Sequence, residues 1–264
     1  MKKAVLLVAL YVPTALAQEP SKDKFQETPG DRKTLKETAE IVKDEEPSAT
    51  SWLWEKQMRP TIEHAGDATS LYLLLGTAAA TSLAHQSDSK FREEYGDNKG
   101  MTQANSSIGA VLGSGFPGIA LAATQLYIDT ENGLQHSRAI VFTAFTHISI
   151  AAAVNRKRPN GKGLSFPSGH TSSSFATAGS MFYAYGPWVG VPAMAVAGYI
   201  GLSRAANNAH WLSDIVAGAG LGMFWARASA QVGITKDKDQ AQWYPIYQPS
   251  DYGPMVGVGF EKNL

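Results

Sequence analysis

From Gly66 to Ala230 the chain alternates apolar segments with short polar turns, and this alternation limits the fold more than any other feature. The apolar residues do not follow the two-residue period of a half-buried strand. Ala, Gly, Ser and Thr dominate the segments, so neighbouring helices can approach closely. We therefore predict an all-α bundle of about six helices, at residues 69–84, 108–128, 139–154, 171–185, 188–202 and 212–228.

The charged segment 85–103 and the polar segment 129–135 are predicted to be connections between these helices. A helix that crosses a membrane needs about 20 apolar residues. By this reading only residues 108–128 reach that length, and Pro117 interrupts them. The lengths favour a soluble or membrane-peripheral bundle over an integral membrane protein.

The N-terminus has the layout of a secretory signal peptide. Two lysines follow Met1, residues 4–12 are apolar, and Ala15-Leu16-Ala17 forms a small-residue cleavage site. The apolar run is too short to cross a bilayer. We predict a signal peptide at residues 1–17 and export to a periplasmic or other extracytoplasmic location. The exported protein could be associated with the membrane. An uncleaved N-terminal anchor is the alternative.

The remaining chain divides by composition. Residues 18–51 are rich in Lys, Glu, Asp, Pro and Thr, and a segment with so few apolar residues is expected to be a disordered leader. The helical domain is predicted at residues 52–230, with a short irregular tail at 231–264. With 23 basic and 23 acidic residues the formal net charge is zero, which gives no reason to expect a nucleic-acid partner. Cysteine is absent, which excludes disulfides and thiolate chemistry.

The segment Ser203–Asp214 carries a pattern suited to nucleophilic catalysis. His210 and Asp214 are four residues apart, so on one helix they would share a face. A carboxylate that accepts a hydrogen bond from one imidazole nitrogen leaves the other nitrogen free as a nucleophile. Arg204 offers a guanidinium suited to phosphate or carboxylate. A structural His–Asp pair is the simpler alternative.

The sequence Pro167-Ser168-Gly169-His170 precedes a predicted helix. A helix start presents free backbone N–H groups and the positive end of the helix dipole, which together attract anions. Ser168 is a candidate N-cap, Gly169 lets the backbone come close to a ligand, and His170 would stand beside the anion as a proton donor. Arg158 ends another predicted helix and could reach the same place.

Taken together, these groups predict phosphoryl transfer. The arginines and the helix N-terminus would neutralise the non-bridging phosphate oxygens. His210 would attack phosphorus to form a phosphohistidine, and His170 would protonate the leaving alcohol. No carboxylate cluster for Mg²⁺ is evident, so we expect no metal and no cofactor.

The chain resembles the type 2 phosphatidic acid phosphatase and vanadium haloperoxidase superfamily. Its three motifs are Lys-x6-Arg-Pro, Pro-Ser-Gly-His and Ser-Arg-x5-His-x3-Asp. The second is complete at residues 167–170, and the third is complete from Ser203 to Asp214. The resemblance implies an all-α bundle, a His210 nucleophile oriented by Asp214, and His170 as general acid. It also implies phosphate binding by Arg158, Ser168, Gly169 and Arg204.

The first motif departs from this pattern. Ala151 stands seven positions before Arg158, where the resemblance leads us to expect lysine. Losing one donor to the transition state can cost about 10²–10³ in rate. Lys162, on the loop that follows Pro159, is a candidate to replace it as a phosphate ligand. His147, one turn before Ala151, could also face the pocket.

The leading functional prediction is an exported, acid-phosphatase-like phosphomonoesterase that acts on a lipid phosphate or a small phosphate ester. A membrane surface is a candidate partner. The first alternative is a weakly active or inactive relative that binds phosphate or phospholipid, because of Ala151. A vanadium-dependent haloperoxidase is the second.

Overall fold

The structure is a computed structural model that describes residues 48–233 and two strands at 242–248 and 255–261. The predicted signal peptide at 1–17 and the leader up to residue 47 lie outside the described residues. The helical elements are α2 (Ala49–Trp52), the π-helix η1 (Leu53–Met58), α3 (Arg59–Ala65), α4 (Ala68–Gln86), α5 (Asp88–Tyr95), α6 (Gln103–Leu112), α7 (Phe116–Ile128), α8 (Thr130–Val154), α9 (Gly169–Tyr185), α10 (Pro187–Ala206) and α11 (Leu212–Ala230).

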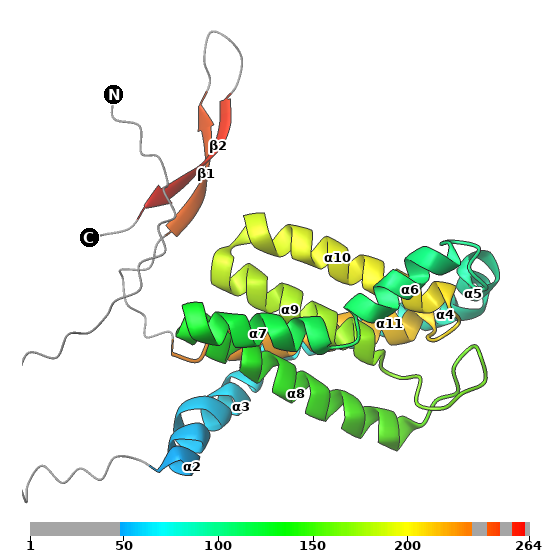
Figure 1. The fold of residues 1–264 in the computed structure, drawn as a ribbon, viewed down its shortest axis with the longest axis horizontal. Helices are drawn as coiled ribbons and strands as arrows, with labels where there is room; N and C mark the ends of the chain where they lie inside the picture. Colours follow the sequence, from blue (N-terminus) through cyan, green and yellow to red (C-terminus); the bar gives the residue numbers. More distant parts are fainter. Residues whose placement is uncertain (1–47, 234–241, 249–254, 262–264) are drawn as a thin grey trace, which may run out of the picture. The chain divides into compact units, whose positions relative to one another are not determined.

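The helices form one bundle in which α9 and α11 pack together along their lengths (Figure 1). Helix α10 covers α9, α4 covers α11, and α8 contacts both central helices. The innermost side chains are small: Ala139, Ala176 and Ala226 are fully buried against one another. Gly222 brings α11 so close to α9 that a Cβ atom there would overlap the Ser172 carbonyl oxygen. The predicted all-α class is confirmed.

The segment predicted as one helix at 108–128 is two helices, α6 and α7. The chain breaks at Gly115, whose φ of 91° is a left-handed conformation that favours glycine. Pro117 then lies in the first turn of α7, where its missing N–H costs no hydrogen bond. In the same region, the predicted connection at 85–103 contains the charged helix α5.

The predicted connection at 129–135 is also wrong, because α8 begins at Thr130. Thr130 and Glu131 are exposed, but Gln135 is buried and donates to the Ser180 carbonyl at 3.3 Å. His136 is fully buried, and its two ring nitrogens lie 2.7 Å from Gln125 Oε1 and 3.0 Å from Thr177 Oγ1. Polar side chains that bond to neighbouring helices were therefore mistaken for a solvent-facing turn.

Three helical segments are long and apolar enough to cross a membrane: Gln103–Ile128, Thr130–Val154 and Pro187–Ala206. The prediction that only one stretch has this length is wrong, because α8 and α10 extend beyond their predicted bounds. Only 17% of the most apolar window in Gln103–Ile128 is buried within the protein. The outer faces carry large apolar side chains at high exposure, among them Phe116 at 79%, Tyr127 at 91%, Phe145 at 72% and Trp188 at 70%.

Two segments of the C-terminal tail are strands. Strands β1 (Gln242–Gln248) and β2 (Met255–Glu261) pair antiparallel, with Ile246 opposite Gly257.

Candidate active site

The three sequence motifs meet where α8 and α10 end and where α9 and α11 begin (Figure 1). Helix α8 ends at Asn155, whose left-handed φ of 44° turns the chain into the loop that precedes α9. This loop is tied to the segment before α11 by the Asn160 amide, which donates to the Asn208 carbonyl at 3.1 Å. The Ser168 amide in turn donates to the Asp214 carbonyl at 2.9 Å.

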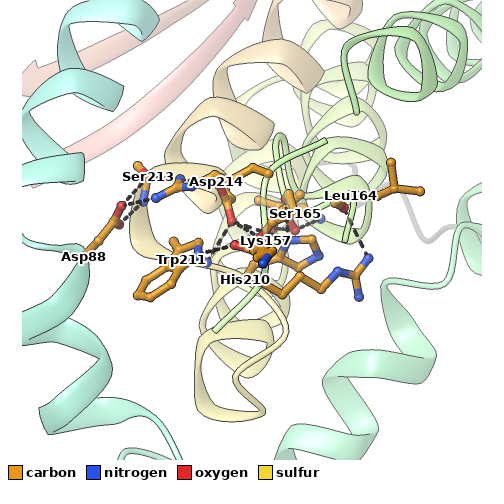
Figure 2. Close-up of polar contacts among 12 residues, drawn as sticks. Asp88, Lys157, Leu164, Ser165, His210, Trp211, Ser213 and Asp214 are labelled. Atoms are coloured by element: carbon orange, nitrogen blue, oxygen red, sulfur yellow. Dashed lines mark hydrogen bonds and ion pairs between the residues drawn. The ribbon is translucent and has the colours of Figure 1, made fainter. Parts of the chain in front are cut away.

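Asp214 is fully buried and accepts hydrogen bonds from three sides (Figure 2). Its carboxylate oxygens lie 2.6 Å from Arg156 Nη1, 2.5 Å from Ser165 Oγ and 2.9 Å from the Trp211 amide. The last bond is made within the first turn of α11. Asp214 therefore joins the α8–α9 loop to the start of α11.

Arg156 also reaches helix α5. Its Nη2 lies 2.7 Å from Asp88 Oδ2, and its guanidinium stacks 5.5 Å from the Trp211 ring centroid. Burial would raise the pKa of Asp88, but hydrogen bonds from Ser213 and Arg156 outweigh it and lower that pKa. Sequence reasoning missed the network of Arg156, Asp88 and Ser165. The one available signal was Arg156, a second arginine two residues before Arg158.

His210 is held by a backbone carbonyl. Its Nδ1 lies 2.7 Å from the Ser165 carbonyl oxygen, whereas the Asp214 carboxylate is 3.8 Å away, too far for a hydrogen bond. The direct His210–Asp214 bond expected from the sequence is not formed, because α11 begins at Leu212 and the two residues do not share a helix. The carboxylate acts on His210 through its charge and through Ser165.

This geometry fixes the tautomer of His210. A carbonyl oxygen only accepts hydrogen bonds, so Nδ1 carries the proton and Nε2 has a free lone pair. Burial lowers the pKa of His210, although the nearby Asp214 opposes the shift. The ring is therefore neutral and its Nε2 is available as a nucleophile.

The N-terminus of α9 forms one wall of the site. Ser168 is the N-cap, fully buried, and its Oγ accepts from the Thr171 amide and hydroxyl. In the described part of the chain, the amides of Gly169 and His170 have no acceptor, as expected in the first turn of a helix. The Ser168 hydroxyl proton and these two amides remain able to bind an anion.

Two guanidinium groups complete the site. Nε of Arg158 and both Nε and Nη1 of Arg204 are buried without an acceptor among the described residues. Buried donors normally have a partner, and a charged donor without one is costly. Arg158 makes only a long bond of 3.4 Å from Nη2 to the Leu164 carbonyl. The two arginines are therefore arranged for an acceptor that the protein itself does not provide.

His170 lies among these positive charges. Burial, followed by the charges of Arg204, His210 and Arg158, lowers its pKa to about 4. His170 therefore lies within electrostatic range of His210 and of both arginines. Lys162 is exposed, and its ammonium contacts none of these residues in the described structure. Its carbonyl instead accepts from the Arg158 amide at 2.7 Å.

The comparison with known families gives a match in this region. The model of the PAP2 superfamily matches residues 134–237, which include the histidines, the arginines and Asp214 of the site but not Asp88. Over these residues the chain is similar to the PAP2 superfamily.

Two known proteins are similar to parts of the chain. A lipid A 1-phosphatase from Porphyromonas gingivalis is 44% identical over 72 residues, which cover 26% of this chain and 16% of that relative. The chain therefore spans about a sixth of the length of that curated relative. A crystal structure of Aquifex aeolicus LpxE is 24% identical, with a TM-score of 0.45, and the match covers 47% of this chain and 82% of that one.

We predict that Arg156→Ala destabilises the protein strongly. Removing one partner from a buried ion pair leaves an uncompensated charge, at a cost of about 3–5 kcal/mol. Thermal unfolding in detergent, followed by circular dichroism, measures this loss. Arg59→Ala is the matched control, since Arg59 makes ion pairs with Glu55 and Glu63 at the surface and should change the unfolding temperature little. Equal losses in the two variants would contradict the assigned role of Arg156.

Proposed function

We propose that the protein is a phosphomonoesterase that hydrolyses a lipid phosphate through a phosphohistidine intermediate. The observation that carries this proposal is the pair of guanidinium groups with buried, unpartnered donors, Arg158 and Arg204. They lie beside the free amides of the α9 N-terminus and two histidines. A tetrahedral dianion presents non-bridging oxygens that match such a set of donors.

The reaction divides into two steps. His210 Nε2 attacks phosphorus, the bond from phosphorus to the leaving oxygen breaks, and His170 donates its proton to that oxygen. His170, now neutral, takes a proton from water as the water attacks the phosphohistidine. The P–N bond breaks, which releases phosphate and returns His210 to its starting state. Arg158, Arg204 and the α9 amides stabilise the charge on the oxygens in both steps.

The surroundings of the site favour a substrate with an acyl chain. An apolar cavity of about 240 Å³ lies between α7, α8, α9 and α10, with Ile140, Met181 and Val196 in its walls. Its lining includes Ser173 and Ser174, whose hydroxyl groups bond to the His170 carbonyl at 3.2 and 2.8 Å. An alkyl chain in this cavity would leave its phosphate near His170.

We propose further that the bundle is embedded in a membrane and that its active end lies at the membrane surface. Two of the three apolar segments, α8 and α10, end at the site. The two similar proteins bear the names of a lipid A 1-phosphatase and of LpxE. The predicted signal peptide supports an extracytoplasmic location for the site.

The alternative is a weakly active or inactive protein that binds phosphate or phospholipid. It follows from Ala151, because the site has one cation fewer than the motif predicts.

His210→Asn should abolish turnover. Asparagine lacks the nucleophilic nitrogen, so we expect a loss of about 10³-fold or more in kcat. Release of phosphate from phosphatidic acid and from p-nitrophenyl phosphate by the wild type and the variant measures it. Turnover that persists in His210→Asn would contradict the phosphohistidine. Phosphate binding without turnover in the wild type would favour the binder.

Activity should be highest at acidic pH. With a pKa of about 4 in the free protein, His170 loses its proton as the pH rises above that value, so kcat/KM should fall. A bound phosphate dianion raises the pKa of His170, so kcat should fall only at higher pH. Steady-state kinetics between pH 4 and 8 test whether kcat/KM falls at a lower pH than kcat. In His170→Ala the fall of kcat/KM with rising pH should disappear. A fall that persists in this variant would show that another group is responsible for it.

Val196→Trp should separate lipid from small substrates. Val196 is 51% exposed at the edge of the cavity, so a larger side chain can fill the cavity without disturbing the core. Excluding two methylenes costs about 1.6 kcal/mol, or about tenfold in kcat/KM for phosphatidic acid. Turnover of p-nitrophenyl phosphate should not change. Equal effects on both substrates would contradict an acyl-chain cavity.

A further inference from the structure

His147, on α8, lies directly against the start of α9. A Cβ atom on Gly169 would stand 2.6 Å from both Cε1 and Nε2 of the His147 ring. No side chain other than hydrogen fits at residue 169 without displacing this imidazole. The ring therefore contacts the same backbone turn whose amides form one wall of the anion site.

The neighbours of the imidazole are positive or neutral. His147 lies within electrostatic range of His210, in the segment before α11, and of Arg158, on the α8–α9 loop. It also acts on His170, at the start of α9, where Arg204 of α10 is a further positive charge. The buried carboxylate of Asp214 already accepts from Arg156, Ser165 and Trp211.

Neither ring nitrogen of His147 is hydrogen bonded to any residue in the described part of the chain. The side chain is half-buried and lies against Gly169 at the start of α9. An imidazole among cations and beside free amides is stabilised in its protonated form by a bound anion. A phosphate oxygen is the partner that would satisfy it, together with the donors of Arg158 and Arg204.

We propose that His147 binds a non-bridging oxygen of the phosphate, as an additional donor of the site; this inference rests on the proposed function. It lies one turn before Ala151 and on the same face of α8. Ala151 is 5% exposed, and its methyl group offers no hydrogen bond. The imidazole supplies a donor on the wall where the motif leads us to expect a lysine, but one whose charge depends on pH.

The test measures the binding of inorganic phosphate to the full chain in detergent by titration calorimetry, at pH 5.5 and pH 8. His147→Ala should weaken binding about tenfold at pH 5.5, as expected for a lost charge-assisted hydrogen bond. His147→Gln keeps a donor of similar reach without the charge, so it should bind more tightly than His147→Ala and lose the part of the pH dependence that His147 contributes. Ser149→Ala is the matched control, an exposed position on the same helix whose hydroxyl bonds only to the Phe145 carbonyl.

A second arm adds Ala151→Lys to His147→Ala. An ammonium on the same helix face should restore phosphate binding and make it less dependent on pH between 5.5 and 8. Rescue of this kind is not expected if His147 serves only to pack the bundle. Circular dichroism of each variant shows whether it is folded, and His147→Gln preserves the shape if His147→Ala is unstable.

Wild-type affinity in both His147→Ala and His147→Gln would overturn the proposal. A loss of phosphate affinity confined to Lys162→Ala would also overturn it, because the additional phosphate donor would then be the loop lysine. The outcome is independent of turnover. Phosphate binding that depends on His147 in a protein without phosphatase activity would contradict the proposed function alone. Phosphatase activity with unchanged phosphate binding in the variants would contradict this inference alone.

Discussion

The buried ion pair between Arg156 and Asp214 is the interaction on which the arrangement of the site depends. Removing two charges from water is costly, and their mutual attraction offsets that cost only when further hydrogen bonds satisfy both groups. Ser165 and the Trp211 amide complete the shell of Asp214, while Asp88 shares Arg156. Because Ser165 is held in this way, its carbonyl is placed to fix the tautomer of His210. His210, the proposed nucleophile, is thus positioned by a carbonyl whose own place is set by the ion pair.

Beyond this pair, the anion site has an excess of positive groups. Arg158 and Arg204 lie within electrostatic range of each other and of His170. Among the described residues neither arginine forms an ion pair with a carboxylate, and Asp214 is engaged by Arg156, Ser165 and the Trp211 amide. Such an arrangement is unfavourable in the empty site and favourable once a dianion binds. Burial and the charges of the same arginines keep the pKa of His170 low in the empty site. In the proposed reaction, substrate binding and protonation of His170 are therefore coupled through these arginines.

The sequence named the groups that the proposed reaction places around phosphate, because each was marked by local chemistry: a helix N-terminus, two histidines and arginines at helix ends. It did not predict Asp88 or Ser165, since they act only through contacts made by the fold between distant segments. For the same reason it did not predict that Ser165 lies between Asp214 and His210. The helix pattern failed where polarity was buried, as at His136, and where Gly115 broke an apolar run. Composition does not distinguish a polar residue that faces water from one that bonds to a neighbouring helix.

The proposed lipid substrate gives one account of two features that are otherwise unrelated. The first is the large apolar surface of α7, α8 and α10, which would be costly to expose to water. The second is the position of the charged site at the ends of α8 and α10, beside a cavity lined by apolar side chains. In a bilayer the apolar surface would face acyl chains and the site would lie at the level of the headgroups. A lipid could then present its phosphate to His210 while its chain stays in an apolar environment, so neither end of the substrate would have to be transferred into an unfavourable medium.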